Sequence, residues 1–229
     1  MSASSLPILK IRTLYKDYDL PGGIVHALQL NYLDAVKGEA IAITGPSGSG
    51  KTTLLHLLAA LSRPTGGSIE FDGQLITSFN SPSAAARWRA KHVGYVFQDA
   101  NLLPDFSVLE NLLIAAEISI VTEKLALERA HTFLECLKLK ERQHHRPAKL
   151  SLGERQRAAV ARALIHKPPI VLADEPTASL DAQNAEIVIN LLLDLCRETI
   201  LIVATHDEAV KKRFPRVVEL RKLEEIQCA

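Results

Sequence analysis

The chain has 229 residues, 47% of them hydrophobic, and a formal net charge of +1. This length suits one α/β domain with a full core, and the near-balanced charge argues against a dedicated nucleic-acid-binding protein. We therefore expect no nucleic acid partner. No apolar run reaches the roughly 18–20 residues that a membrane span requires. The first five residues lack the charged and apolar regions of a secretory signal, so we expect none.

The chain opens with β-rich segments at residues 8–18 and 27–33, which a Pro-Gly-Gly turn at 21–23 separates. A further apolar strand is expected at 40–44. Ser68–Phe71, followed by Asp-Gly, is typical of one arm of a hairpin. These patterns predict an antiparallel β portion near the N-terminus.

A glycine-rich loop lies between the apolar strand and a leucine-rich helix. It is formed by Gly45, Pro46, Ser47, Gly48, Ser49, Gly50, Lys51 and Thr52. This spacing, in a strand–loop–helix context, is typical of a phosphate-binding loop. Glycines allow backbone N–H groups to curl around phosphate oxygens, and the helix dipole favours the same anion. We expect Lys51 to reach the β- and γ-phosphates of a nucleoside triphosphate and Thr52 to ligate Mg²⁺.

The pattern becomes helical after Gln98, which follows an expected strand at 93–97. Ser107 and Glu110 have the spacing of a capping box at the start of a helical stretch that extends to about residue 140. Apolar residues then recur at helical spacings. This stretch predicts an all-helical insertion within an α/β domain.

Strands alternate with helices again from residue 154 onward. Apolar segments at 170–173, 200–204 and 217–220 are expected strands, with helices between them. This alternation predicts a mainly parallel sheet covered by helices. Asp174 and Glu175 follow the first of these strands, where ligands bind in open α/β sheets. Paired acids there suit a metal ligand and a base that activates water.

Residues 150–157, Leu-Ser-Leu-Gly-Glu-Arg-Gln-Arg, resemble the signature motif of ATP-binding-cassette (ABC) ATPases. Four further motifs accompany it in the family's order. They are the phosphate loop, Gln98, the acid pair with Ser179-Leu180-Asp181, and His206. The resemblance covers essentially the whole chain. Ser151 and Glu154 also fit a helix-capping box, and a capped helix start can itself present N–H groups to an anion.

The resemblance implies a phosphate-loop NTPase core of the ABC type. We expect a single domain over residues 1–229, with a core at 1–97 and 157–229 and a helical insertion at about 98–156. It also implies ATP hydrolysis with Mg²⁺ as cofactor. The implied partners are a second copy in an ATP-sandwich homodimer and integral membrane permease subunits. The implied location is the cytoplasmic face of the cell membrane.

The resemblance further implies roles at the hydrolytic centre. Ser47 to Thr53 hold the phosphates. Asp174 is the acid on the Mg²⁺ side, Glu175 is the general base, and His206 senses the γ-phosphate. Gln98 contacts Mg²⁺ and reports the nucleotide state to the membrane partner.

Other implied roles concern the adenine and the second copy. Tyr18 resembles the aromatic residue that stacks on adenine, and Tyr15 is the competing candidate. In the family two cassettes bind head to tail, so Ser151 and Gly153 of one would face the γ-phosphate held by the other. Asp181 would lie in a loop at that interface.

A finer resemblance comes from Phe97-Gln98-Asp99, from Leu102 to Phe106 and from Leu109-Glu110-Asn111. These residues look like those of the lipoprotein-releasing, macrolide-efflux and FtsE-type division group. The leading hypothesis is a transporter subunit for a lipophilic or lipoprotein cargo. The alternatives are a division-type ATPase that transmits force without cargo, and a soluble DNA-repair type ATPase.

One position departs from the family pattern. Leu152 stands where the signature usually has its first glycine, whereas Gly153 is retained. A leucine cannot readily adopt a positive φ, so we expect ordinary helical or extended dihedrals there. Its side chain is expected to point away from the phosphate, towards the helical insertion or the partner cassette.

Overall fold

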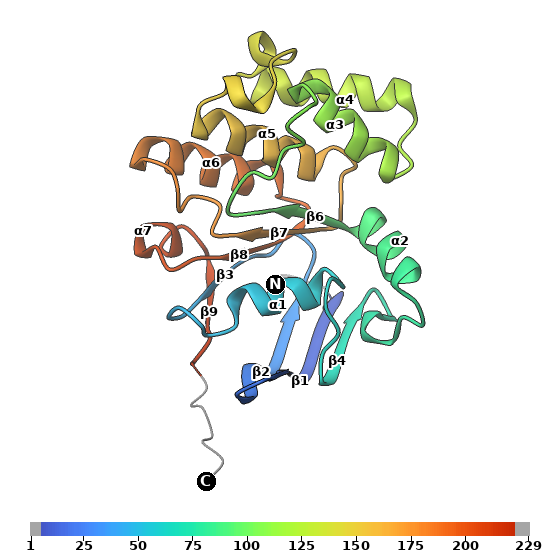
Figure 1. Ribbon diagram of the computed structural model, residues 1–229, viewed down its shortest axis with the longest axis vertical. Coiled ribbons are helices and arrows are strands. Elements are labelled where there is room, and N and C mark those ends of the chain that lie inside the picture. The colour runs from blue at the N-terminus through green and yellow to red at the C-terminus, as the bar shows by residue number, and fades with distance from the viewer. Residues whose placement is uncertain (1–5, 223–229) are drawn as a thin grey trace, which may run out of the picture.

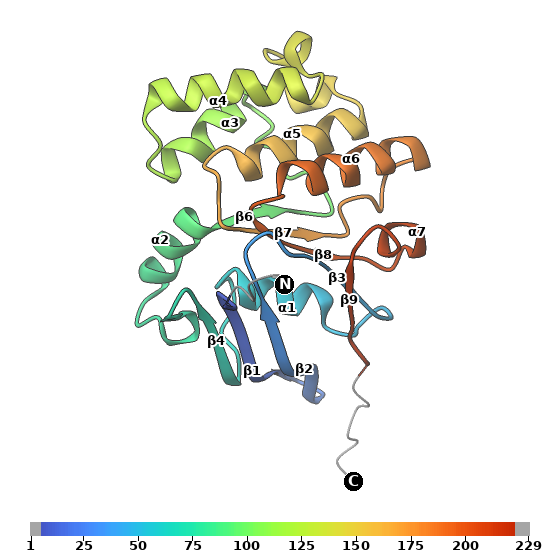
Figure 2. The ribbon, with the colours of Figure 1, turned by 180° about the vertical axis from the view of Figure 1, so that it is seen from behind.

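The computed structural model describes residues 6–222, and residues 1–5, where we expect no secretory signal, lie outside this range. Two β-sheets organise the described chain (Figures 1 and 2). Within residues 6–222, no helix is both long and apolar enough to cross a bilayer.

The first sheet is antiparallel and is built from the N-terminal part of the chain. Its strand order is β2-β1-β4-β5. The strands are β1 (Leu9–Leu20), β2 (Gly23–Ala35), β4 (Gly66–Phe71) and β5 (Gln74–Leu75). The predicted antiparallel portion is therefore confirmed. β1 and β2 extend further than the sequence predicted because they pair almost to the tip of their hairpin, where Leu20 lies opposite Gly23.

The second sheet is parallel and combines β3 with the four strands that follow β5 in the chain. Its order is β6-β7-β8-β3-β9. The strands are β6 (Val93–Val96), β7 (Ile170–Asp174), β8 (Ile200–Ala204), β3 (Ala40–Thr44) and β9 (Arg216–Glu219). All four neighbouring pairs are parallel. β7 and β8 are buried throughout, which explains their continuous apolar sequences.

Helices cover both faces of the parallel sheet. α1 (Lys51–Leu58) lies between the two sheets, whereas α5 (Leu152–Leu164) and α6 (Ala182–Leu195) lie on the opposite face (Figures 1 and 2). The remaining helices are α2 (Pro82–His92) and α7 (Glu208–Lys211) in the core, and α3 (Val108–Ile118) and α4 (Glu123–Cys136) in the expected insertion. Three short 3-10 helices span Ile76–Ser78, Lys140–Arg142 and Pro147–Lys149.

The expected insertion has a hydrophobic cluster of its own. Val108, Leu112 and Leu134 pack there together with residues of α5. The capping box at the start of α3 is present as predicted, with Ser107 and Glu110 bonded reciprocally. α5 runs through the predicted boundary at residues 156/157, so one rigid helix belongs to both parts. The division into core and insertion stays a prediction.

Candidate active site

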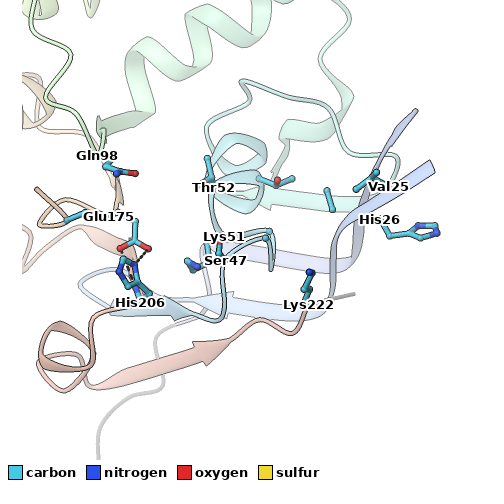
Figure 3. Close-up of a pocket in the computed structure, with 14 residues that line it drawn as sticks. Val25, His26, Ser47, Lys51, Thr52, Gln98, Glu175, His206 and Lys222 are labelled. Atoms are coloured by element: carbon cyan, nitrogen blue, oxygen red, sulfur yellow. Dashed lines mark hydrogen bonds and ion pairs between the residues drawn. The ribbon is translucent and has the colours of Figure 1, made fainter. Parts of the chain in front are cut away.

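A cavity of about 660 Å³ lies where the carboxyl ends of the parallel strands meet. The phosphate loop, Gln98, Glu175 and His206 converge on it from separate elements (Figure 3). Its lining comprises Val25, His26, Ala27, Ser47, Gly48, Gly50, Lys51, Thr52, Thr53, Gln98, Glu175, Ala178, His206 and Lys222. The carboxyl ends of β3, β6, β7 and β8 share one edge of the parallel sheet, which brings together the phosphate loop, Gln98, Glu175 and His206. Val25, His26 and Ala27 come instead from β2 of the antiparallel sheet.

The phosphate loop depends on glycine geometry at two positions. Gly48 and Gly50 have φ values of 79° and 91°, which disfavour any residue with a side chain. A Cβ on Gly50 would also lie 2.3 Å from the carbonyl oxygen of Ala27. Lys51 opens α1, and its ammonium donates hydrogen bonds to the carbonyls of Gly45 (2.8 Å) and Pro46 (3.1 Å). The loop therefore curls around a cation at the positive end of a helix, an arrangement suited to phosphate.

Thr52 and Asp174 meet beside the loop. The Thr52 hydroxyl donates to Oδ1 of Asp174 over 3.2 Å. Burial raises the pKa of the Asp174 carboxyl, and the hydrogen bond from Thr52 acts in the opposite direction. Mg²⁺ prefers oxygen ligands and is commonly held by one or two carboxylates together with substrate phosphates. The hydroxyl and carboxylate fit that ion. Within residues 6–222, no group of three His, Cys, Asp or Glu residues could hold a metal.

Glu175 and His206 form a pair at the other side of the loop. The His206 Nδ1 lies 2.8 Å from Oε1 of Glu175, and the backbone N–H of His206 donates to Oε2 over 3.3 Å. Glu175 itself has a φ of 44°, which is costly for a residue with a side chain. Its N–H donates to the carbonyl of Ala204, at the end of β8. This strained backbone is held by the neighbouring strand and aims the carboxylate into the cavity.

The signature residues lie outside this cavity. Ser151 caps α5: its hydroxyl accepts from the N–H of Glu154 (3.2 Å), while the Glu154 carboxylate accepts from the N–H of Ser151 (2.8 Å). Gly153 is buried, and a Cβ there would lie 2.4 Å from Oδ1 of Asn184. Asn184 in turn donates from its backbone and side-chain amides to the two carboxylate oxygens of Asp181. Asp181 therefore caps α6, and Asn184 connects it to the signature helix.

Leu152 begins α5 and is not among the described residues with a positive φ, as predicted. Its side chain is 53% exposed and borders a second cavity, of about 230 Å³. Gln98, Leu102 and Leu180 border the same cavity. The leucine thus lies beside the segment that opens the expected insertion.

Neither candidate for the adenine-stacking residue lines the main cavity. The ring of Tyr15 packs on Gly66, where a Cβ would lie 2.2 Å from it. Tyr18 lies opposite Val25 in the β1–β2 pair, and Val25 does line the cavity. Cross-strand partners share one face of a sheet, which places Tyr18 beside the cavity rim. This geometry favours Tyr18 over Tyr15, and its role stays a prediction.

Sequence reasoning missed several residues that hold the site together. Gln156 is buried in α5, and its side-chain amide donates to the carbonyl of Phe97, next to Gln98. Asn111 in α3 bonds the backbone of Leu103, Phe106 and Ser107. Asn184, which bonds Asp181 and accepts from Arg157, is a further example. Lys222, which lines the cavity, was also missed. The available signals were the position of Gln156 within the signature stretch and that of Asn111 within Leu109-Glu110-Asn111, which is part of the finer resemblance.

Comparisons with known proteins agree with this geometry. Residues 29–178 match the family described as ABC transporter. The chain is 42% identical over 225 residues to the lipoprotein-releasing system ATP-binding protein LolD of Syntrophus aciditrophicus (strain SB), covering 97% of this chain and 100% of the relative. It is 43% identical over 217 residues to the protein of the same name from Legionella pneumophila (strain Paris), covering 94% and 95%.

A solved structure is also similar. The ATP-binding cassette MJ0796, in a dimeric post-hydrolysis state bound to ADP and Pi, superposes with a TM-score of 0.85 at 33% identity, covering 93% of this chain and 94% of that one. The architecture of two sheets and a helical insertion is therefore that of a solved cassette. On the family match, the identities and this superposition, the chain belongs to the ABC transporter family, as an ATP-binding ATPase cassette.

Proposed function

We propose that this cassette binds Mg²⁺-ATP in the 660 Å³ cavity, uses Glu175 to activate the attacking water, and thereby drives membrane subunits that release lipoproteins. The observation that carries the chemistry is the convergence of Lys51, Thr52, Glu175 and His206 on one cavity. The names of the relatives support lipoproteins as the cargo. They favour the lipoprotein-releasing hypothesis over the division-type and DNA-repair alternatives.

The residues divide the work of hydrolysis. The backbone amides of the loop and the Lys51 ammonium stabilise charge on the phosphates. Thr52 and Asp174 would hold Mg²⁺, which when bound would neutralise part of the same charge. Glu175 accepts a proton as water attacks the γ-phosphorus and the bond to the bridging oxygen of ADP breaks. His206 orients the Glu175 carboxylate through the 2.8 Å contact of its Nδ1. Gln98 lines the cavity, where its side-chain amide would contact bound Mg²⁺.

A second copy of the chain completes the site in this proposal. Ser151 and Gly153 do not reach their own chain's cavity, although capped helix starts favour anions. A head-to-tail homodimer would bring them to the γ-phosphate of the other copy, with Asp181 near the interface. The dimeric state of MJ0796 supports this arrangement.

The membrane subunit would dock beside the cavity, on the segment that follows Gln98. Phe106 is exposed there, as is Asp105, and the buried Asn111 holds the backbone of this segment in place. Docking there would place the cassette at the cytoplasmic face of the membrane. Movement of Gln98 on hydrolysis could then reach the partner through a short, ordered segment.

Replacing Phe106 by alanine, or reversing the charge of Asp105, should weaken co-purification with the membrane subunit in detergent while ATP binding stays unchanged. The reason is that both side chains are exposed and neither lines the nucleotide cavity. Mass spectrometry of the material co-purified with the wild type identifies the membrane partner. A matched control is Ile24→Ala, an exposed apolar residue in the β1–β2 hairpin. Loss of ATP affinity with the partner still bound would contradict the proposal.

A further inference from the structure

A second lysine reaches the nucleotide cavity from the last described segment of the chain. Lys222 is among the residues that line the cavity, together with Lys51 and the loop glycines. Figure 3 shows Lys222 beside the phosphate loop, on the side opposite Glu175 and His206. No motif in the sequence analysis includes this residue.

The backbone fixes where this segment lies. β9 pairs with β3 so that Glu219 lies opposite Thr44, the last residue before the phosphate loop. The N–H of Leu220 donates to the carbonyl of Thr44 over 2.8 Å. The contact continues into the loop, because a Cβ on Gly45 would lie 2.4 Å from the carbonyl oxygen of Leu220. The segment after β9 therefore runs alongside the start of the loop, and Lys222 follows two residues later.

The two ends of the cavity differ in chemistry. Glu175 and His206 mark the end where the γ-phosphate would react. Val25 from β2 lines the other part, next to its cross-strand neighbour Tyr18. Lys222 lies on this second side of the loop in Figure 3. A nucleotide bound between these ends would present its ribose and α-phosphate to Lys222.

We propose that Lys222 is a nucleotide-binding residue whose ammonium contacts the α-phosphate of bound ATP or ADP. This inference rests on the proposed function of the cavity. A lysine ammonium is a compact charge on a flexible stem, so it can follow a phosphate that the loop already holds. Hydrogen bonds between two charged groups are stronger than neutral ones. Because ATP and ADP share the α-phosphate, the contact adds equally to the affinity for both.

The neighbouring Arg221 offers a matched control. It carries the same charge one residue earlier and is exposed, yet it does not line the cavity. An effect of overall charge near the site would therefore appear in variants of both residues. A direct contact would appear only in variants of Lys222.

The test is equilibrium binding of Mg²⁺-ATP and of ADP to Lys222→Gln, Lys222→Arg and Arg221→Gln. We expect Lys222→Gln to raise both dissociation constants by about three- to tenfold, as for one partly exposed ionic contact. The increase should shrink in high salt, because salt screens exposed charges. Lys222→Arg should restore most of the affinity, and Arg221→Gln should bind as the wild type does.

Unchanged affinity in Lys222→Gln would overturn the inference, as would an equal loss in Arg221→Gln. A loss confined to ATP would place the ammonium at the γ-phosphate and would overturn the assignment to the α-phosphate. Failure of the proposed function has a different signature, since the wild type itself would then show no saturable ATP binding. That result would overturn both proposals together.

Discussion

Replacing Glu175 by glutamine should lower ATP turnover by about 10²–10⁴-fold, the usual contribution of a general base. Glutamine keeps the shape of the side chain and can still accept the hydrogen bond that the backbone N–H of His206 donates to Oε2. It cannot take the proton from water. ATP should therefore bind normally and remain intact, and a homodimer that forms only with ATP should accumulate in gel filtration with light scattering.

A suitable control is Glu208→Gln in α7. That carboxylate is exposed and pairs with Lys211, and it does not line the cavity. Its turnover should equal that of the wild type. Near-normal phosphate release by purified Glu175→Gln would remove Glu175 from the role of base.

Replacing Gly153 by aspartate should lower the ATPase activity, measured with the membrane subunits present, by at least about tenfold. Two physical reasons act together. The new Cβ would lie 2.4 Å from the Asn184 amide oxygen and would displace the side chain that bonds Asp181. The new carboxylate would also stand beside the γ-phosphate of the second copy, where like charges repel. Leu152→Gly should change the rate less than Gly153→Asp or Ser151→Ala, because Leu152 points towards the second cavity.

A second variant separates charge from packing. Gly153→Ala displaces Asn184 in the same way but adds no charge, and thermal melting of both variants reports any loss of folding. We expect Gly153→Asp to be much less active than Gly153→Ala at equal folded fraction. A silent Gly153→Asp would refute the trans-acting signature. If the wild type is instead nearly inactive and Leu152→Gly activates it, the native leucine weakens the signature site and slows turnover.

The phosphate loop could be predicted from sequence because its chemistry is local: glycines, lysine and threonine follow one another between a strand and a helix. The acid pair and His206 were predictable for a similar reason, since they lie at or within two residues of the end of an apolar strand. The order of these motifs along the chain then indicated the resemblance to ABC ATPases. Strand ends were less predictable, because β1 and β2 extend through pairing with each other and not through local propensity.

Most of the contacts that sequence reasoning missed join distant parts of the chain, although Asn111 bonds residues only four to eight positions away. Asn184 reaches Gly153 only because α6 packs beside α5. Lys222 reaches the cavity only because β9 pairs with β3 at the sheet edge. The strained φ of Glu175 likewise depends on β8, which accepts its N–H. The order of strands in the sheet determines which segments become neighbours. A single sequence does not directly indicate that order.

Equilibrium binding of radiolabelled ATP, with Mg²⁺, to the wild type and to Lys51→Met tests the account most directly. Among the residues that the structure describes, Lys51 bonds only the loop carbonyls of Gly45 and Pro46, and it faces the cavity. Its loss should therefore spare the fold and remove the central cation. Lys37→Met, at a largely exposed ion pair with Glu198, is the control. We predict saturable binding by the wild type and by the control, with affinity at least about tenfold weaker in Lys51→Met. Equal affinity in all three proteins would contradict the assignment of this loop as the nucleotide site.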